Sequence, residues 1–262
     1  MAMDETLKAE SRLTPHKRVV VVGASSGIGA ALAQQLASEG YLVAALARRA
    51  EVLEKVCMQI NEAAGEGAAR GYVHDAADHG EIPGMFQKIL RELGGIDALV
   101  YVAGVQHPVG INEYDIEKDR EMIEVNLLGA MAWMGEAARL FEQMKAGQIV
   151  GISSVAGDRG RVGSPAYNTS KAGMNTYLEA LRNRLTRHGV NVLTVKPGFV
   201  ESELMRKNAK MVFGVISPEK AAKDIWRAMR KRKQQLYTPG WWRWLMLGIQ
   251  HTPSFIFRRL SF

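Results

Sequence analysis

Cysteine is nearly absent from the sequence: Cys57 is the single one among 262 residues. One cysteine forms neither a disulfide within the chain nor a cysteine-cluster metal site, and such low usage is typical of a reducing compartment. The first eighteen residues are polar and of mixed charge, without the apolar segment that a secretory signal requires. We therefore expect a cytoplasmic protein without a bound metal.

The sequence also lacks internal repeats, low-complexity tracts and linkers rich in Gly, Pro and Ser. Hydrophobic residues make up 47% and charged residues 23%, which excludes a disordered chain. A chain of this length buries a full core. We expect a polar extension over residues 1–16, one domain over 17–240 and an aromatic and basic tail over 241–262.

Positive charge is unevenly distributed. The net charge is +7, and residues 201–262 contain thirteen Lys and Arg against four Asp and Glu. Such a region is typical of nucleic-acid binding, of contact with an anionic membrane, or of a solvated helix face around Lys220–Lys233. No helix-turn-helix or RNA-binding signature is present, so no nucleic-acid partner is expected.

Apolar runs alternate with helical patterns, which predicts a Rossmann-like, doubly wound α/β fold with a parallel sheet. The expected strands are Arg18–Val22, Leu42–Leu46, Gly71–His74, Ala98–Val102, Gln148–Ile152 and Val190–Val195. The expected helices are Ile28–Glu39, Ala50–Ala64, Ile82–Leu93, Arg120–Met144, Ala166–Arg187 and Pro218–Lys231.

A glycine-rich turn joins the first expected strand to the first expected helix. Its sequence, Gly23-Ala24-Ser25-Ser26-Gly27-Ile28-Gly29, offers backbone N–H groups and a helix N-terminus to a pyrophosphate. Gly23 allows the tight turn, Gly27 the approach of the phosphates, and Gly29 close packing of helix and strand. Because this turn follows a strand and precedes a helix, it predicts a dinucleotide site.

The end of the second expected strand indicates which dinucleotide binds. A carboxylate there would accept hydrogen bonds from a free ribose hydroxyl, but the sequence is Ala47-Arg48-Arg49. Two guanidinium groups suit a 2′-phosphate, which favours NADP(H) over NAD(H). Asp75 and Ala76, after the third strand, are expected near the adenine.

Three polar side chains are candidates for the chemistry. Tyr167 and Lys171 are four residues apart in an expected helix, so they share one face, and a nearby ammonium is expected to lower the pKa of the phenol. Ser154 follows the fifth strand, at the sheet edge where ligands bind. Together they predict proton exchange with a substrate oxygen.

These motifs, in this order, resemble the short-chain dehydrogenase/reductase family over about residues 17 to 235. The resemblance implies a catalytic set comprising Asn126, Ser154, Tyr167 and Lys171. It also implies further cofactor-binding residues: Ala103, Gly104, Pro197, Gly198, Val200 and Ser202. Val22 and Tyr101 depart from the family pattern at structural positions.

The resemblance implies a mechanism as well. Nicotinamide delivers hydride to a substrate carbonyl carbon, Ser154 polarises the oxygen and Tyr167 donates the proton. Lys171 lowers the pKa of Tyr167 and holds the nicotinamide ribose, while Asn126 links Lys171 to solvent through a water. The expected activity is reduction of a ketone or aldehyde, or the reverse oxidation. A 3-oxoacyl thioester reductase is the alternative, and a non-catalytic NADP(H)-binding regulator is the alternative outside enzymes.

Specificity is expected from two segments. Residues 199–216 form a lid in this family, and here the lid mixes Met and Leu with Arg and Lys, which suits an apolar or lipid-like substrate with an anionic part or an ordinary amphipathic helix. The tail carries Trp241, Trp242 and Trp244, but its apolar stretch is too short to span a bilayer. It covers the substrate entrance, packs on the domain or another subunit, or contacts an anionic membrane.

The resemblance also implies a homodimer or homotetramer. Members of the family pair through the two long helices, expected here at Arg120–Met144 and Ala166–Arg187. Apolar side chains expected on their exposed faces are Leu127, Met131, Met134, Tyr177, Leu178 and Leu181.

Overall fold

The computed structural model describes residues 17–201 and 214–260. The N-terminal extension at 1–16, Ser202 and most of the expected lid lie outside the described residues.

The described chain forms a seven-stranded sheet in the order β3-β2-β1-β4-β5-β6-β7, with every neighbouring pair parallel. This order reverses direction at β1, as in a doubly wound sheet, so ligands are expected at the carboxyl edge next to β1 and β4. The strands are β1 Lys17–Val22, β2 Tyr41–Ala47, β3 Ala69–Val73, β4 Ala98–Tyr101, β5 Gln148–Ile152, β6 Asn191–Pro197 and β7 Gln235–Thr238.

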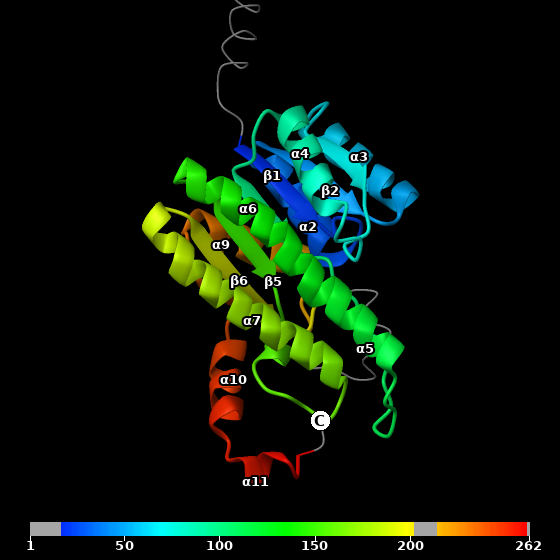
Figure 1. Ribbon diagram of the computed structural model, residues 1–262, viewed down its shortest axis with the longest axis vertical. Helices are drawn as coiled ribbons and strands as arrows, with labels where there is room; N and C mark the ends of the chain where they lie inside the picture. The colour runs from blue at the N-terminus through cyan, green and yellow to red at the C-terminus, as the bar shows by residue number, and fades with distance from the viewer. Residues whose placement is uncertain (1–16, 202–213, 261–262) are drawn as a thin grey trace, which may run out of the picture.

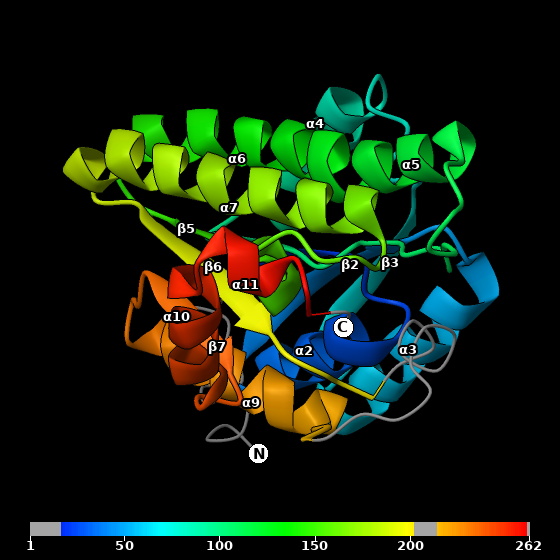
Figure 2. The same ribbon diagram turned by 90° about the horizontal axis from the view of Figure 1, so that it is seen from below.

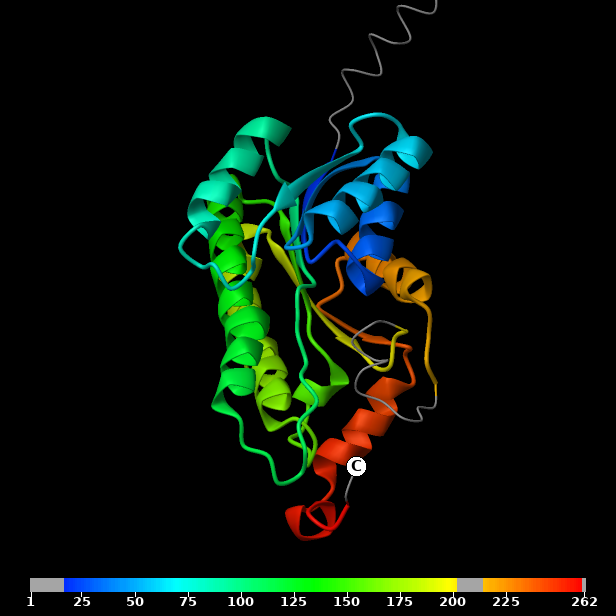
Figure 3. The same cartoon turned by 90° about the vertical axis from the view of Figure 1, so that its right-hand side faces the viewer.

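Helices cover both faces of the sheet, which makes three layers (Figure 3). One layer contains α4 Ile82–Leu93, α5 Ile116–Ile123, α6 Ala130–Met144 and α7 Pro165–Leu185. The opposite layer contains α2 Gly27–Ser38, α3 Ala50–Ala64 and α9 Pro218–Arg230. Figure 2 shows the sheet between the two layers. The predicted Rossmann-like α/β fold is therefore confirmed.

Alternate side chains of the central strands enter two separate cores. Val19 and Val21 of β1 pack with α2, α3 and α9, whereas Val20 and Val22 pack with α4, α6 and α7. Because both faces are buried, a strand such as β1 consists of an uninterrupted apolar run rather than an alternating one. This burial fixes the carboxyl ends of the strands, and hence the loops that follow them.

One expected helix differs from the structure, and one strand of the sheet was not expected. The helix expected at Arg120–Met144 begins earlier, at Ile116, and is divided into α5, a π-helical segment at Glu124–Gly129 and α6. The edge strand β7 was not predicted, because its sequence, Gln-Leu-Tyr-Thr, has no continuous apolar run.

The tail continues the fold beyond the sheet. After β7, α10 spans Trp242–His251 and the short α11 spans Ser254–Phe257. Both lie at the end of the molecule toward which the strands point, opposite the N-terminal end (Figure 1). Among the described residues, no helix is both long enough and apolar enough to cross a membrane.

Candidate active site

The glycine-rich turn has the geometry that a bound dinucleotide needs. Gly23 has φ +98°, and a side chain there would meet the backbone of Ala103 at 2.5 Å. A side chain at Gly29 would come within 2.0 Å of the Gly23 carbonyl oxygen. Gly27 has φ +54° and begins α2, whose N-terminus has no side-chain cap from Ser26. The turn therefore leaves backbone donors of α2 available for phosphate oxygens.

Two arginines lie beside this turn, at the end of β2. The Nη2 atom of Arg49 is 3.2 Å from the Ser26 hydroxyl and 3.4 Å from that of Ser25. Arg48 instead forms an exposed ion pair with Asp75, at 3.5 Å. Asp75 is thus bound to the arginine rather than standing alone at its strand end. Ala76 is buried, and Ile28, the second residue of α2, packs against the core.

Asn126 lies in the π-helical segment between α5 and α6. It is fully buried; its Oδ1 accepts from Val105 N at 2.7 Å, and its Nδ2 donates to Val105 O and to the Ser170 hydroxyl. The π turn gives Asn126 this orientation, and such turns frequently occur at functional sites. Tyr101, a departure from the family pattern, is fully buried and donates to the Val125 carbonyl at 2.5 Å.

Gly104 lies where this segment meets α7. A Cβ atom built there would be 3.2 Å from Asn126 Oδ1 and 3.5 Å from Lys171 Nζ. The loop after β4 therefore passes directly over both side chains. Ala103 donates from its backbone to Val22 O at 2.8 Å, which joins this loop to the glycine-rich turn.

Ser154, Tyr167 and Lys171 are brought together at the carboxyl end of β5. The Lys171 ammonium donates to Ile152 O at 3.1 Å and lies 5.8 Å from the centre of the Tyr167 ring. The Ser154 hydroxyl lies close enough to the Tyr167 phenol to lower its pKa. Tyr167 and Lys171 are 8% and 4% exposed, so water reaches this group only in small part.

The electrostatics of this group differ from the sequence expectation. Burial raises the pKa of Tyr167, while the Ser154 hydroxyl and the nearby Arg161 lower it. Burial lowers the pKa of Lys171 to about 8. Burial is the largest influence, so the pKa of Tyr167 is raised and the expected net lowering of the phenol pKa is wrong.

The Pro197-Gly198 segment meets the tail. A Cβ atom at Gly198 would come within 1.8 Å of Trp242 Nε1, and Trp242 and Met246 of α10 pack with Val155, the residue after Ser154. Val200 is buried and bridges to Ile216. The tail therefore packs on the domain and borders the segment that carries the candidate serine.

Sequence reasoning missed three charged residues between Ser154 and Tyr167. Asp158, Arg159 and Arg161 all lie on the loop that joins β5 to α7. The short sequence around these residues does not indicate what they do, because two of the three bind partners that are far away in sequence. Asp158 contacts Lys196 and Tyr237, and Arg159 contacts the end of α10.

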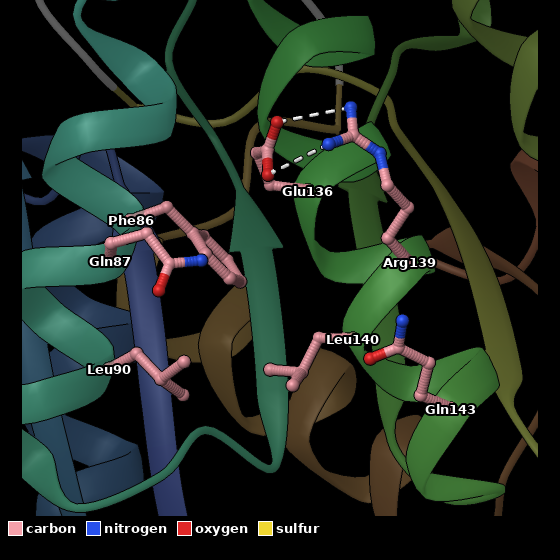
Figure 4. Close-up of a pocket in the computed structure, with 7 residues that line it drawn as sticks. All are labelled: Phe86, Gln87, Leu90, Glu136, Arg139, Leu140 and Gln143. Carbon is pink, nitrogen blue, oxygen red and sulfur yellow. Dashed lines mark hydrogen bonds and ion pairs between the residues drawn. The ribbon is translucent and has the colours of Figure 1, made fainter.

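A separate hollow lies between α4 and α6 (Figure 4). It is lined by Phe86, Gln87, Leu90, Glu136, Arg139, Leu140 and Gln143. Glu136 and Arg139, one turn apart on α6, form an ion pair at 3.1 Å on one side of it. None of the predicted site residues lines this hollow, which is separate from the group around Tyr167.

The expected pairing surface is smaller than predicted. Met134 and Leu178 are fully buried and Leu181 is 6% exposed, because they pack toward the sheet. Their assignment to exposed helix faces is therefore wrong. Leu127 and Tyr177 are partly buried, and Met131 is 37% exposed.

Comparisons with known proteins agree with the fold and the motifs. A 3-oxoacyl-(acyl-carrier-protein) reductase of Rattus norvegicus is 30% identical over 190 residues, which cover 72% of this chain and 78% of the relative. An oxidoreductase of Myxococcus xanthus with no characterised activity is 36% identical over 194 residues, with coverages of 74% and 76%. A solved actinorhodin polyketide ketoreductase with NADPH superposes with a TM-score of 0.77 at 25% identity, covering 85% of this chain and 95% of that chain. The model of the family described as short chain dehydrogenase matches residues 17–212, and the chain belongs to that family.

Proposed function

We propose that the protein is an NADP(H)-dependent oxidoreductase that reduces a ketone or aldehyde to an alcohol, or runs the reverse reaction. The observation that carries the proposal is the buried group at the end of β5, where the Ser154 hydroxyl meets the Tyr167 phenol and Lys171 lies beside its ring. A hydroxyl pair in a partly dry site suits proton transfer to a carbonyl oxygen. Membership of an oxidoreductase family supports the same reaction class.

The chain's residues fit a nicotinamide dinucleotide. The glycine-rich turn leaves no room for a side chain at Gly23 or Gly29, and its backbone donors are available to a pyrophosphate. Gly104 and Lys171 would border the nicotinamide ribose at the other end. When bound, the nicotinamide supplies or removes the hydride.

Each protein group then has a distinct task in reduction. Ser154 donates a hydrogen bond to the substrate oxygen and orients it. Tyr167 gives that oxygen a proton, and its raised pKa keeps the phenol protonated at neutral pH. Lys171 offsets the negative charge that remains on the phenolate, and its lowered pKa eases return of the proton. The fixed Asn126 side chain holds the β4 loop over this path.

The preference for NADP(H) rests on Arg49. Its guanidinium lies against the serines of the glycine-rich turn, where a 2′-phosphate on the adenosine ribose would meet it. The exposed Arg48–Asp75 ion pair adds a second guanidinium on this side. The NADPH in the solved polyketide ketoreductase supports the same preference for this chain.

A 3-oxoacyl thioester is the alternative substrate, favoured by the similarity to the rat reductase. Purified protein with NADPH is offered acetoacetyl thioesters and a panel of free ketones, and cofactor oxidation is followed. Turnover of free ketones with little thioester turnover supports a ketone reductase. The reverse pattern supports a 3-oxoacyl thioester reductase. Binding of NADPH without turnover of either class would instead support a regulator.

We propose that the tail covers the substrate entrance, because α10 packs on Val155 and Phe199 beside Ser154. Its outer side carries Trp244, which is 70% exposed, and other apolar residues, so contact with an anionic membrane is the competing role. For assembly we propose pairing of two or four copies through the faces around Met131 and Tyr177. Size-exclusion chromatography with light scattering tests this pairing.

A further inference from the structure

The loop between Ser154 and Tyr167 carries three charged side chains with very different surroundings. The first, Asp158, is completely paired: its Oδ1 lies 2.5 Å from Lys196 Nζ, and its Oδ2 accepts from the Tyr237 hydroxyl at 2.8 Å. The Asp158 side chain is 1% exposed. This buried pair fastens the start of the loop to β6 and β7.

The second charged residue, Arg159, is also completely engaged. Its Nη1 donates to the carbonyl oxygens of Ile249, Gln250 and Thr252, at 3.3 Å for Gln250 and 2.6 Å for Thr252. Its guanidinium carbon lies 3.8 Å from the centre of the Phe257 ring. Arg159 thus caps the carboxyl end of α10, where a positive charge is favourable.

The third charged residue, Arg161, has no such partner within the described part of the chain. Its Nε atom is buried without a hydrogen-bond partner, and no described carboxylate lies within ion-pair distance. The backbone here is nevertheless fixed, because the Asn168 amide donates to Arg161 O at 3.4 Å and to Gly163 O at 3.0 Å. The backbone of Arg161 is therefore held in place, while its buried Nε atom has no partner among the described residues.

Arg161 and the Tyr167 phenol influence each other electrostatically. Burial lowers the pKa of Arg161, and the charge that opposes this change comes from the Tyr167 phenol. In return, Arg161 lowers the pKa of Tyr167. The Asn168 side chain, next to Tyr167 in α7, donates to the Arg161 carbonyl, so Arg161 lies beside the first turn of the helix that carries the phenol.

A half-buried guanidinium whose Nε atom has no partner is costly to keep, and a bound oxyanion would reduce that cost. Arg is well suited to this, because its planar donors match a carboxylate or phosphate with two parallel hydrogen bonds. Asp158 and Arg159, the two charged neighbours on this loop, are already engaged in structural contacts. Of the three, Arg161 is therefore the one available to a ligand.

We infer that Arg161 binds an oxyanion of the substrate, a carboxylate or a phosphate ester, while Ser154 and Tyr167 act on the substrate's carbonyl. The inference rests on the proposed reductase function and names its substrate class: carbonyl compounds that carry a negative group. Recognition of the oxyanion orients the carbonyl toward Tyr167 and selects charged substrates over neutral ones of the same shape.

The test compares charged and neutral members of matched substrate pairs. In one arm, aliphatic oxo acids of increasing length are compared with their methyl esters. In the other, acetoacetyl-CoA is compared with the uncharged N-acetylcysteamine thioester of acetoacetate. For Arg161→Gln we expect kcat/KM to fall about tenfold or more on the charged member, through a raised KM, with little change on the neutral one. The arm that shows this loss identifies a carboxylate or a phosphate as the bound group.

Arg161→Lys should retain part of the preference, and Arg91→Gln, on exposed α4, is the matched control. Equal losses on charged and neutral members, with a shifted pH profile of kcat, would overturn the inference, because Arg161 would then act through Tyr167. Calorimetric titration of the NADP⁺-loaded protein with the same oxo acids adds a readout without turnover. If the wild type turns over neither member, the proposed function fails, and retained, Arg161-dependent binding of the oxo acid would still support the anion site.

Discussion

The indole of Trp242 fills the space in front of Gly198, so closely that an added Cβ would come within 1.8 Å of its Nε1 atom. The ring also stacks on Trp241, with centres 4.6 Å apart, and meets Phe199 edge-on. A glycine is thus required at this position for packing, because the space that a side chain would occupy is filled by Trp242 of α10.

Gly198→Ala is expected to displace Trp242 and loosen α10. Overpacking at a close contact typically costs about 1–3 kcal/mol of unfolding free energy. Thermal unfolding should show a lowered Tm, and tryptophan fluorescence should shift because the indole becomes more exposed. Gly240→Ala, where a Cβ would meet nothing within 4 Å, is the matched control. An unchanged Tm and spectrum in Gly198→Ala would contradict this packing.

Tyr167→Phe removes the proposed proton donor and keeps the ring. We expect the reductase rate to fall by at least about 10²–10⁴-fold, the usual worth of general acid catalysis, with NADPH affinity little changed. Steady-state rates and a fluorescence titration of NADPH measure the two effects. Tyr177→Phe is the control, because its hydroxyl bonds Met131 O on the surface, away from the site. Near-wild-type rates in Tyr167→Phe would mean that another group is the acid.

Lys171 makes stability depend on pH. Burial lowers its folded pKa to about 8, whereas an unfolded lysine titrates near 10.4. Between these values the unfolded chain binds a proton that the folded chain has lost, so the contribution of Lys171 to unfolding free energy rises with pH. The unfolding free energy of Lys171→Met minus that of the wild type should therefore be highest near pH 7 and fall toward pH 10.

Denaturant unfolding of the cofactor-free proteins at several pH values measures this difference. Lys55→Met, on the exposed side of α3, is the control for losing a lysine. A difference for Lys171→Met that stays flat from pH 7 to 10 would show that the ammonium is better solvated than its burial indicates.

Arg49→Ala tests the choice of cofactor. Charge-assisted hydrogen bonds are worth about 1.5–3 kcal/mol, so NADPH affinity should fall about ten- to a hundredfold, while NADH affinity stays near the wild-type value. Arg48→Asp should weaken NADPH as well, through repulsion of the 2′-phosphate. Kd values for both cofactors give the ratio. Equal wild-type affinities for NADH and NADPH would overturn the preference itself.

The two sides of α10 separate the roles of the tail. Met246 is buried against Val155, so Met246→Ala is expected to alter KM for ketones if the tail covers the entrance. Trp244, Leu245 and Leu247 are exposed, and their joint replacement by serine should leave the kinetics unchanged. Co-sedimentation with anionic vesicles completes the experiment. Unchanged KM in Met246→Ala together with vesicle binding lost in the serine variant would favour the membrane role.

The parts of the fold that the sequence predicts are those with strong local patterns. Strands buried on both faces, such as β1 and β5, have continuous apolar runs, and α3 and α4 match their expected bounds. The glycine-rich turn and the Tyr167–Lys171 spacing are also local. The strand β7 was not predicted, because an edge strand needs apolar residues at fewer positions and so lacks a continuous apolar run.

Other features depend on contacts that no short window of sequence contains. The π-helical turn at Asn126 accompanies a hydrogen bond from Tyr101, which is 24 residues away from its acceptor Val125. Arg159 meets carbonyls 91 and 93 residues further along the chain. The raised pKa of Tyr167 follows from its burial, which becomes visible only when the layers are assembled.

Because Arg159 caps α10, the tail and the β5–α7 loop are structurally coupled. A chimera that received this tail without residues 158–161 would leave the last carbonyls of α10 without the Arg159 guanidinium that binds them. Transplanting substrate preference between relatives would therefore require two segments to move together, one from the middle of the chain and one from its end.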